Sequence, residues 1–177
     1  MTLDENDYLT YQLYTASKTP RIRKARIRSW ILTTVAFLCL TYLFFENSND
    51  LLGYYFLVAS VLSLTLNPIY SRWRYKRHYL KYIQDTFKKK FGEETTLEIT
   101  EDYIATRDKT GEAKINTTQI EAINEIKDFY FVQMRTGESL IISKVKTDDP
   151  DSLKREITSL IEKKVIKHNV ELDWRWK

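Results

Sequence analysis

Ser29–Phe45 reads SWILTTVAFLCLTYLFF, and Leu51–Ser71 reads LLGYYFLVASVLSLTLNPIYS. Neither stretch contains a charged residue, whereas the rest of the chain is rich in them. A helix needs about 20 residues, at about 1.5 Å each, to cross the hydrocarbon core of a bilayer. The second stretch meets that length, and the first is completed by long basic side chains that can snorkel to the interface. The sequence therefore predicts a transmembrane helical hairpin at residues 29–71, with helices at 29–46 and 51–71.

The connection between the two stretches, Glu46–Asp50, is short and acidic, which predicts a tight turn between antiparallel helices. Both outer flanks are basic, so the positive-inside rule places both termini in the cytoplasm and the turn outside. We therefore expect a multi-pass protein of the cytoplasmic (inner) membrane. The basic and aromatic residues expected at the interface with anionic lipid are Arg21, Arg23, Lys24, Arg26, Arg28, Trp30, Arg72, Trp73, Arg74, Lys76 and Arg77.

Two alternatives for the apolar stretches stay open. The first stretch could be a signal peptide, but a polar segment with Asp4, Glu5 and Asp7 precedes it and no small-residue cleavage site follows. Both stretches could instead be core helices of a soluble bundle, but a soluble helix normally keeps a polar stripe. Within the hairpin, the few polar residues are expected to join the two helices. They are Thr33, Thr34, Thr41, Ser60, Ser63 and Asn67.

The charge is unevenly distributed along the chain. Residues 91–177 carry 14 Lys and Arg against 18 Asp and Glu, and the net charge of the whole chain is +4. The excess of basic residues therefore lies beside the apolar stretches, which indicates lipid headgroups as partners and no nucleic acid. The single cysteine, Cys39, excludes an intrachain disulfide and a cysteine-rich zinc site.

The segments that flank the hairpin are expected to be helical. Residues 1–28 form an N-terminal cytoplasmic unit, in which Thr2 and Glu5 have the spacing of a capping box. This predicts an amphipathic helix from about Leu3 to Ser17, followed by a basic segment. Residues 72–92 predict a basic juxtamembrane helix that continues out of the bilayer and ends at Gly92.

Residues 93–177 predict a small α+β domain, because the apolar period changes to two after Gly92. Five to six short strands and two hairpins are expected between residues 95 and 143. Asp149 and Pro150 then begin a helix, for which Asn169 is a plausible end. The expected fold is a small antiparallel sheet closed by this C-terminal helix. The tail from Val170 predicts an edge strand, with a membrane-interface segment bearing Trp174 and Trp176 as the alternative.

The order of these segments resembles that of the YcxB-like family. The residues that carry the resemblance are Asp7-Tyr8-Leu9, Leu13-Tyr14, the basic run Arg21–Arg28, Ile115, Ile120, Ile123, Glu125, Phe129–Phe131, Gly137 and Leu140–Lys144. The family often has a short strand before the first motif, where this chain has only Met1–Asn6. The resemblance implies a membrane location and a domain like a bacterial pleckstrin-homology (PH) fold, a partial barrel, with no established activity.

No catalytic, metal or cofactor site is predicted. The two histidines, His78 and His168, do not have a metal-ligand spacing, and His168 is expected to favour the negative end of a helix dipole. We therefore expect no enzyme, but a membrane-anchored interaction module with an unidentified protein partner. The partner surface is expected at a strand edge or at Phe129, Tyr130, Phe131, Trp174 and Trp176. An accessory subunit of a transport or stress-response complex, an anionic-lipid sensor, and a homo-oligomer through the hairpin remain alternatives.

Overall fold

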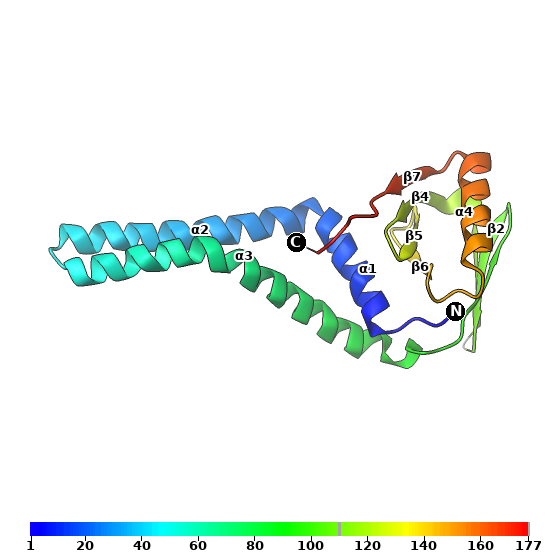
Figure 1. Cartoon of the computed structure of the whole chain (residues 1–177), viewed down its shortest axis with the longest axis horizontal. Coiled ribbons are helices and arrows are strands. Elements are labelled where there is room, and N and C mark those ends of the chain that lie inside the picture. Colours follow the sequence, from blue (N-terminus) through cyan, green and yellow to red (C-terminus); the bar gives the residue numbers. More distant parts are fainter. Residues whose placement is uncertain (110, 177) are drawn as a thin grey trace. The chain divides into compact units, whose positions relative to one another are not determined.

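The computed structural model describes residues 1–109 and 111–176 (Figure 1). The helices are α1 (Glu5–Lys18), α2 (Pro20–Glu46), α3 (Asp50–Phe87) and α4 (Pro150–Lys164), with short 3-10 turns at Lys88–Lys90 and Thr117–Gln119. The strands are β1 (Thr96–Ile99), β2 (Tyr103–Asp108), β3 (Gly111–Asn116), β4 (Ile120–Glu125), β5 (Phe129–Met134), β6 (Ser139–Ser143) and β7 (Lys167–Val170). The chain divides into two compact units, which are described separately. The helix unit comprises residues 12–81 with Trp176, and the sheet unit comprises residues 1–11 and 82–175.

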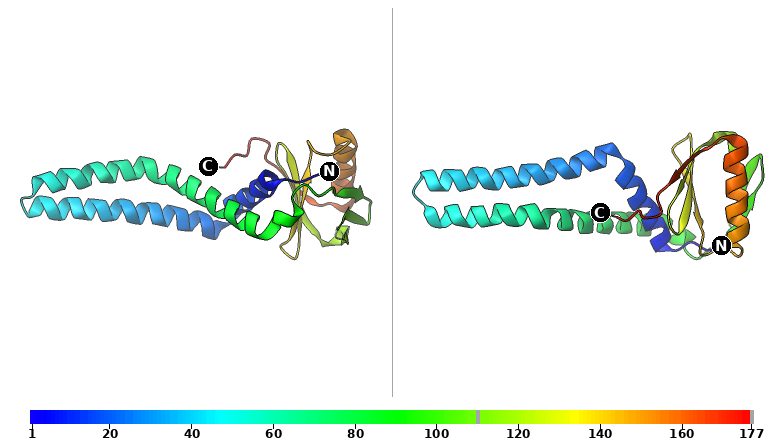
Figure 2. Two further views of the ribbon diagram at one scale, coloured as in Figure 1. Left: turned by 90° about the horizontal axis from the view of Figure 1, so that it is seen from below. Right: turned by 45° about the horizontal axis from the view of Figure 1, so that its top comes forward.

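In the helix unit, α2 and α3 are each long and apolar enough to cross a membrane. They run side by side away from a turn at Asn47–Asn49 (Figures 1 and 2). Helix α2 begins at Pro20, before the uncharged stretch that starts at Ser29, because proline suits the first position of a helix. Helix α3 continues through the basic segment, as predicted, but it ends at Phe87, before the predicted end at Gly92, and a 3-10 turn at Lys88–Lys90 follows.

A seam of small and polar residues joins the two helices. Thr34, Thr41, Ser60 and Ser63 are buried, and the hydroxyl oxygens of Thr34 and Ser63 lie 3.3 Å apart across the interface. Near the turn, the rings of Phe44 and Phe56 stack with centroids 5.3 Å apart. Small and hydroxyl-bearing residues allow close approach of helix backbones in lipid, and this contact supports the predicted role of these residues.

The outward faces of α2 and α3 are apolar. Only 11% of the apolar window in each helix is buried, and Leu51 is 83% exposed. The same faces expose Ile31, Leu32, Val35, Leu38, Val58, Val61, Leu62, Leu64, Leu66 and Ile69. A core helix of a soluble protein would instead be mostly buried, so this arrangement disfavours the soluble-bundle alternative.

The sheet unit contains two separate sheets. Strands β1, β2 and β3 form one antiparallel sheet, and the second has the order β6-β5-β4-β7. Within the second sheet, β7 pairs parallel to β4, with His168 opposite Ile123 and Val170 opposite Glu125. The predicted α+β class is confirmed. The predicted single antiparallel sheet in a PH-like partial barrel is wrong, because the described strands form two sheets and do not close into a barrel.

Helix α4 supplies the centre of the sheet unit. Its buried residues Leu153, Ile157 and Leu160 pack into one cluster with side chains from both sheets, including Ile104 of β2 and Ile123 of β4. Figure 2 shows α4 beside the strands of both sheets. Each sheet thus buries one face against the same helix, and α4 connects two sheets that share no strand.

The start of α1 is capped differently from the prediction. Asp4 Oδ1 accepts hydrogen bonds from the backbone N–H groups of Asn6 and Asp7, and Asp7 Oδ2 accepts one from Asp4 N–H at 2.7 Å. The reciprocal pair is therefore Asp4 and Asp7, and not Thr2 and Glu5, because Thr2 forms a β-bridge with Glu94.

Lys146 neutralises this acidic cap. Its Nζ atom lies 2.6 Å from a carboxylate oxygen of both Asp4 and Asp7. The hydrogen bond from Lys146 holds the pKa of Asp4 below its usual value of 3.8. Burial alone would lower the pKa of Lys146, but its hydrogen bonds to the two carboxylates raise it above its usual value. The first turn of α1 is thus attached to the segment that follows β6.

Helix α4 begins as predicted, with Asp149 Oδ1 accepting from the N–H groups of Asp151 and Ser152. Its end differs from the prediction, because the helix stops at Lys164 and Asn169 lies in β7. The C-cap is Val165, which has a left-handed backbone with φ 53° and a side chain that is 90% exposed. Left-handed backbone is costly for a β-branched residue, so the chain turns here at the expense of local strain.

Val165→Gly should therefore stabilise the sheet unit by about 1 kcal/mol, because the relief of strain exceeds the extra chain entropy of glycine. The measurement is thermal unfolding of the full chain in detergent, and we expect a rise of a few degrees in Tm. Val145→Gly is the matched control, since Val145 is also exposed but does not have a positive φ. An equal change in both variants would contradict the assignment of strain to Val165.

Candidate membrane-interface site

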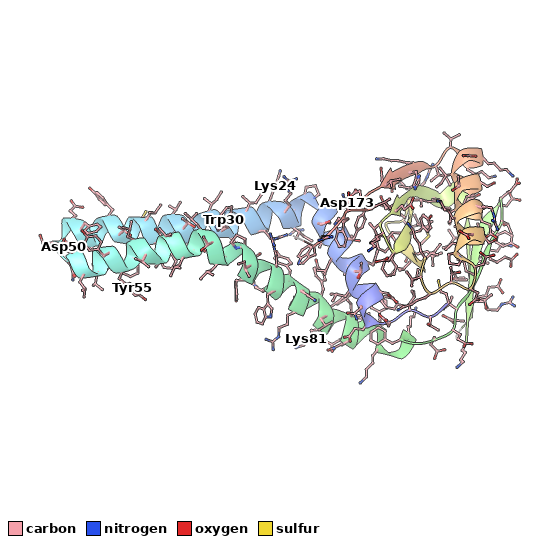
Figure 3. The ribbon with its side chains drawn as sticks, in the orientation of Figure 1. Lys24, Trp30, Asp50, Tyr55, Lys81 and Asp173 are labelled. Carbon is pink, nitrogen blue, oxygen red and sulfur yellow. The ribbon has the colours of Figure 1, made fainter. Side chains whose placement is uncertain are left out.

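Positive charge is concentrated at the basic ends of α2 and α3, within segments that contain no acidic residue. Residues 8–45 and 51–84 contain no Asp or Glu. Figure 3 shows Lys24 and Lys81 toward one end of the pair and Asp50 at the other. Charge is therefore segregated along the helices, with cations at one end and carboxylates at the turn.

A cavity of about 240 Å³ lies between α2 and α3 at the basic end. The α2 residues that line it recur at spacings of three and four positions, so they lie on successive turns of one helix face. The α3 residues that line it also lie on successive turns of one face. The lining residues are Arg23, Arg26, Ile27, Trp30, Asn67, Pro68 and Ser71. The space is thus surrounded by guanidinium, indole, amide and hydroxyl groups, and Ile27 and Pro68 form its apolar walls.

Pro68 explains why a space exists at this level. Proline inside a helix has no N–H to donate to the carbonyl of residue i−4, here Leu64, and its ring crowds that carbonyl. One turn toward the acidic loop, Thr34 and Ser63 still touch. Beyond Pro68, α3 departs from α2 (Figure 1). The cavity occupies the beginning of this separation.

The indole of Trp30 contributes an unsatisfied donor. Its Nε1 atom is buried and has no hydrogen-bond partner among the residues that the structure describes. A buried donor without an acceptor costs about 1–3 kcal/mol, so such groups are rare and call for an explanation.

Trp176, near the C-terminus, belongs to this basic end of the helix unit. The Arg26 guanidinium lies 4.9 Å from the centroid of the Trp176 ring. The ring centroids of Tyr75 and Trp176 are 6.4 Å apart. The indole N–H of Trp176 donates to the backbone oxygen of Arg72 at 3.3 Å. The predicted edge strand is therefore wrong beyond Val170, where β7 ends. Trp176 instead packs on the basic end of the helix unit, and the membrane-interface alternative stays a prediction.

The other predicted interface residues do not line the cavity. Trp73 is 54% exposed and lies beside Tyr70, with the Arg77 guanidinium 5.3 Å from its ring centroid. Exposed side chains at the same end of the helices are Arg21, Lys24, Arg28, Arg72, Arg74 and Lys76. These residues form a diffuse basic surface, whereas only Arg23, Arg26 and Trp30 converge on one space.

The predicted aromatic partner surface is largely interior. The exposed fractions of Phe129, Tyr130 and Phe131 are 7%, 3% and 1%. Their rings are buried because β5 is a central strand, paired with β4 on one side and β6 on the other. Tyr11 covers Phe131 with ring centroids 5.3 Å apart. These three residues therefore do not form an exposed docking surface. Trp174 is half-buried.

A titratable cluster links β4 to the strands on both sides of it. Glu125 accepts from Lys144 Nζ at 2.7 Å, and its other oxygen lies 2.9 Å from Nε2 of His168. Burial would raise the pKa of Glu125, but the hydrogen bonds to Lys144 and His168 hold it below the usual 4.5. Burial, with the charge of Glu125, raises the pKa of Tyr130 to about 12. His168 is thus a strand residue with a carboxylate partner, and not a helix-end residue as predicted.

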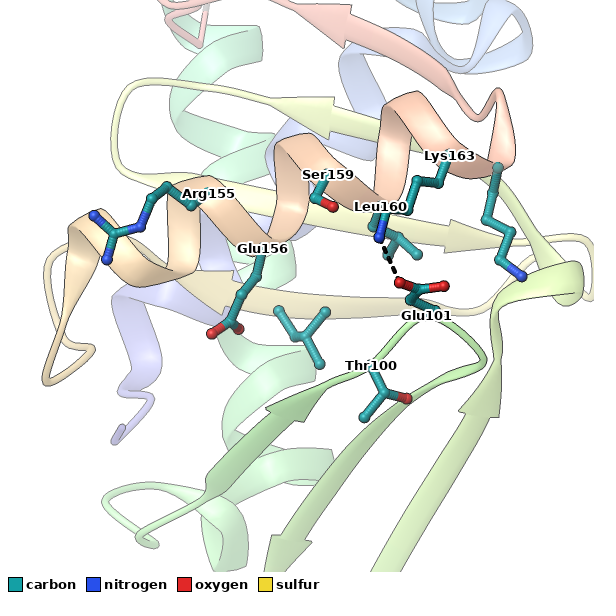
Figure 4. Close-up of a pocket in the computed structure, with 9 residues that line it drawn as sticks. Thr100, Glu101, Arg155, Glu156, Ser159, Leu160 and Lys163 are labelled. Carbon is teal, nitrogen blue, oxygen red and sulfur yellow. Dashed lines mark hydrogen bonds and ion pairs between the residues drawn. The ribbon is translucent and has the colours of Figure 1, made fainter.

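In the sheet unit, a groove lies between α4 and the β1–β2 turn (Figure 4). Its volume is about 320 Å³, and Lys163 of α4 forms an ion pair with Glu101 across it. Its lining contains Ser159 but no histidine or cysteine.

No cluster of three or more His, Cys, Asp or Glu that could hold a metal ion occurs within residues 1–109 and 111–176. Cys39 is exposed on the outer side of α2. No protein-family model matches the chain, and no curated protein or solved structure matches it either. The resemblance to the YcxB-like family therefore stays a prediction that rests on the motifs quoted above.

Sequence reasoning missed the contributions of Asn67 and Ser71 to the basic end. Asn67 was expected only to join the helices, yet it lies with Ser71 in the lining of the cavity. The available signal is helical phase, because Asn67 and Ser71 are four residues apart and flank Pro68 on one side of α3.

Glu125→Gln should lower the stability of the sheet unit at pH 7 by about 2 kcal/mol, since it removes the carboxylate partner of the partly buried Lys144 ammonium and of the His168 imidazole. Because the folded-state pKa of Glu125 is depressed, its contribution is present above about pH 4.5 and is lost as pH falls through the folded value. Unfolding curves of the full chain between pH 7 and 3 should therefore converge for the variant and the unchanged protein. Glu121→Gln, at an exposed position on β4, should show no such convergence.

Proposed function

We propose that the chain is a non-enzymatic, membrane-anchored interaction module. The α2–α3 pair crosses the cytoplasmic membrane, both termini are cytoplasmic, and the sheet unit meets its partners on that side. The observation that carries the proposal is the apolar outer face of two long helices, exposed at residues such as Leu32, Leu51 and Leu62. Such an exposed surface is unfavourable in water and favourable in lipid.

The orientation is supported by the segregation of charge along the helices. Eleven basic or aromatic interface residues lie on the two outer flanks, and Glu46 and Asp50 bound the turn. Each basic residue near an anionic leaflet contributes about 1 kcal/mol, and basic flanks are retained on the cytoplasmic side.

An interaction role for the sheet unit is supported by its open strand edges. The first sheet ends in β3, where every described residue except Ile115 is exposed. An unpaired edge strand offers backbone donors and acceptors to a strand from another protein. With the rings of β5 buried, the β3 edge is the surface at which we place the protein partner.

Cysteine accessibility tests the membrane arrangement. In a Cys39→Ser background, Asn49→Cys in the turn should react with an impermeant maleimide in right-side-out vesicles. Val145→Cys, after β6, should react only once the vesicles are opened. The native Cys39 should stay unreactive until detergent is added. Labelling of position 145 from outside would invert the orientation, and release of the chain by alkaline carbonate would refute the anchor.

Site-specific cross-linking tests the interaction role. A photoreactive residue in place of Glu112 or Lys114 on β3 should capture one recurrent protein during purification of the full chain in mild detergent. The matched control replaces Arg155 on α4 and should not capture it. Capture of transport subunits would favour the accessory-subunit alternative, and recovery of the uncross-linked chain alone would contradict a protein partner at this edge.

A further inference from the structure

We infer that the cavity at the basic end of α2 and α3 is a binding site for the phosphodiester group of an anionic membrane phospholipid. This assignment rests on the proposed function, because a phospholipid reaches the cavity only if the helices lie in a bilayer. It goes beyond general attraction to a charged leaflet, since it assigns one lipid to one set of residues.

The donors of the cavity suit a phosphate group. Arg23 and Arg26 lie three residues apart on one face of α2, and both line the space with Asn67 and Ser71 of α3. The planar guanidinium matches phosphate oxygens in a bidentate manner, and amide and hydroxyl donors can complete the shell. No carboxylate lines the cavity, and residues 8–45 and 51–84 provide none.

Trp30 gives the cavity an aromatic wall. Its Nε1 atom is buried without an acceptor among the described residues, so the ring and not the N–H faces the open space. Tryptophan is also the residue type that prefers the headgroup level of a bilayer, with its ring toward the chains and its N–H toward polar groups.

The depth of the cavity agrees with the position of a lipid phosphate. On its turn side, the contact between Thr34 and Ser63 closes the helix pair, and the uncharged stretch Ser29–Phe45 begins at the level of Trp30. On its other side lie the basic flanks. The cavity therefore occupies the boundary between the uncharged and the cationic parts of the helices, where phosphates lie in a bilayer.

The size of the cavity favours a headgroup and not a whole lipid. Its volume of about 240 Å³ accommodates a phosphate with its neighbouring glycerol carbons, while Ile27 and Pro68 give these carbons an apolar wall. The acyl chains then lie outside the cavity, against exposed apolar residues such as Ile31 and Ile69.

Native mass spectrometry of the full chain in detergent, titrated with phosphatidylglycerol or phosphatidylcholine, tests the assignment. We expect one phosphatidylglycerol to bind with an affinity at least tenfold above that for phosphatidylcholine. Arg23→Gln with Arg26→Gln should abolish this preference. Asn67→Ala with Ser71→Ala removes the neutral donors of the lining, and it should weaken phosphatidylglycerol binding about tenfold.

Lys81→Gln with Lys88→Gln is the matched control, because it removes the same charge from exposed positions outside the cavity. It should leave the single-lipid preference intact. Equal weakening by the two charge-removing variants, or an unchanged affinity in Asn67→Ala with Ser71→Ala, would overturn the site in favour of diffuse attraction. Displacement of the lipid by inorganic phosphate at equal concentration would assign the cavity to a soluble anion and overturn the lipid assignment.

Alkaline carbonate extraction distinguishes a failure of the lipid site from a failure of the membrane anchor. A chain that stays in the membrane but binds phosphatidylglycerol no better than phosphatidylcholine overturns the site alone. A chain that carbonate releases overturns the anchor and the site with it.

Discussion

The apolar outer face of the α2–α3 pair has to be kept out of water, and the rest of the molecule is organised around this constraint. Long exposed rows of leucine, valine and isoleucine are stable only in contact with lipid or with other protein. In lipid every backbone polar group must be satisfied internally, which two continuous helices achieve. The polar side chains Thr34, Thr41, Ser60 and Ser63 are buried, and Thr34 and Ser63 meet across the seam.

The same constraint explains the distribution of charge. A carboxylate within the helices would be costly in lipid, and residues 51–84 contain none although they include the basic segment after the second apolar stretch. The sheet unit, by contrast, uses carboxylates as structural partners, as at Glu125 between Lys144 and His168 and at Asp4 and Asp7 around Lys146. The two units thus differ in composition: the sheet unit contains carboxylate–cation pairs, whereas residues 12–45 and 51–81 of the helix unit contain no Asp or Glu.

The sequence predicted features that depend on neighbouring residues and missed those that depend on distant pairing. Length and lack of charge gave the two apolar helices, and Asp149 with Pro150 gave the start of α4. The division into two sheets was not predictable, because alternation reveals a strand but not its neighbour. Phe129–Phe131 looked like an exposed hairpin, yet β5 is central and continuously apolar, as strands covered on both faces are. Val165 was missed because no residue preference predicts a left-handed valine.

The candidate site was also predictable only in part. The sequence shows the basic residues as a run, but a run of basic residues specifies only a charged surface and not a cavity. A space between helices arises because Pro68 interrupts the hydrogen bonding of α3 beside the last close contact of the pair. Packing fails at the level where the chain changes from uncharged to basic, and the unsatisfied N–H of Trp30 lies at that level. Pro68 of α3 and two arginines of α2 therefore lie around one space, which gives the proposed phosphate a defined place that a run of cations alone would not.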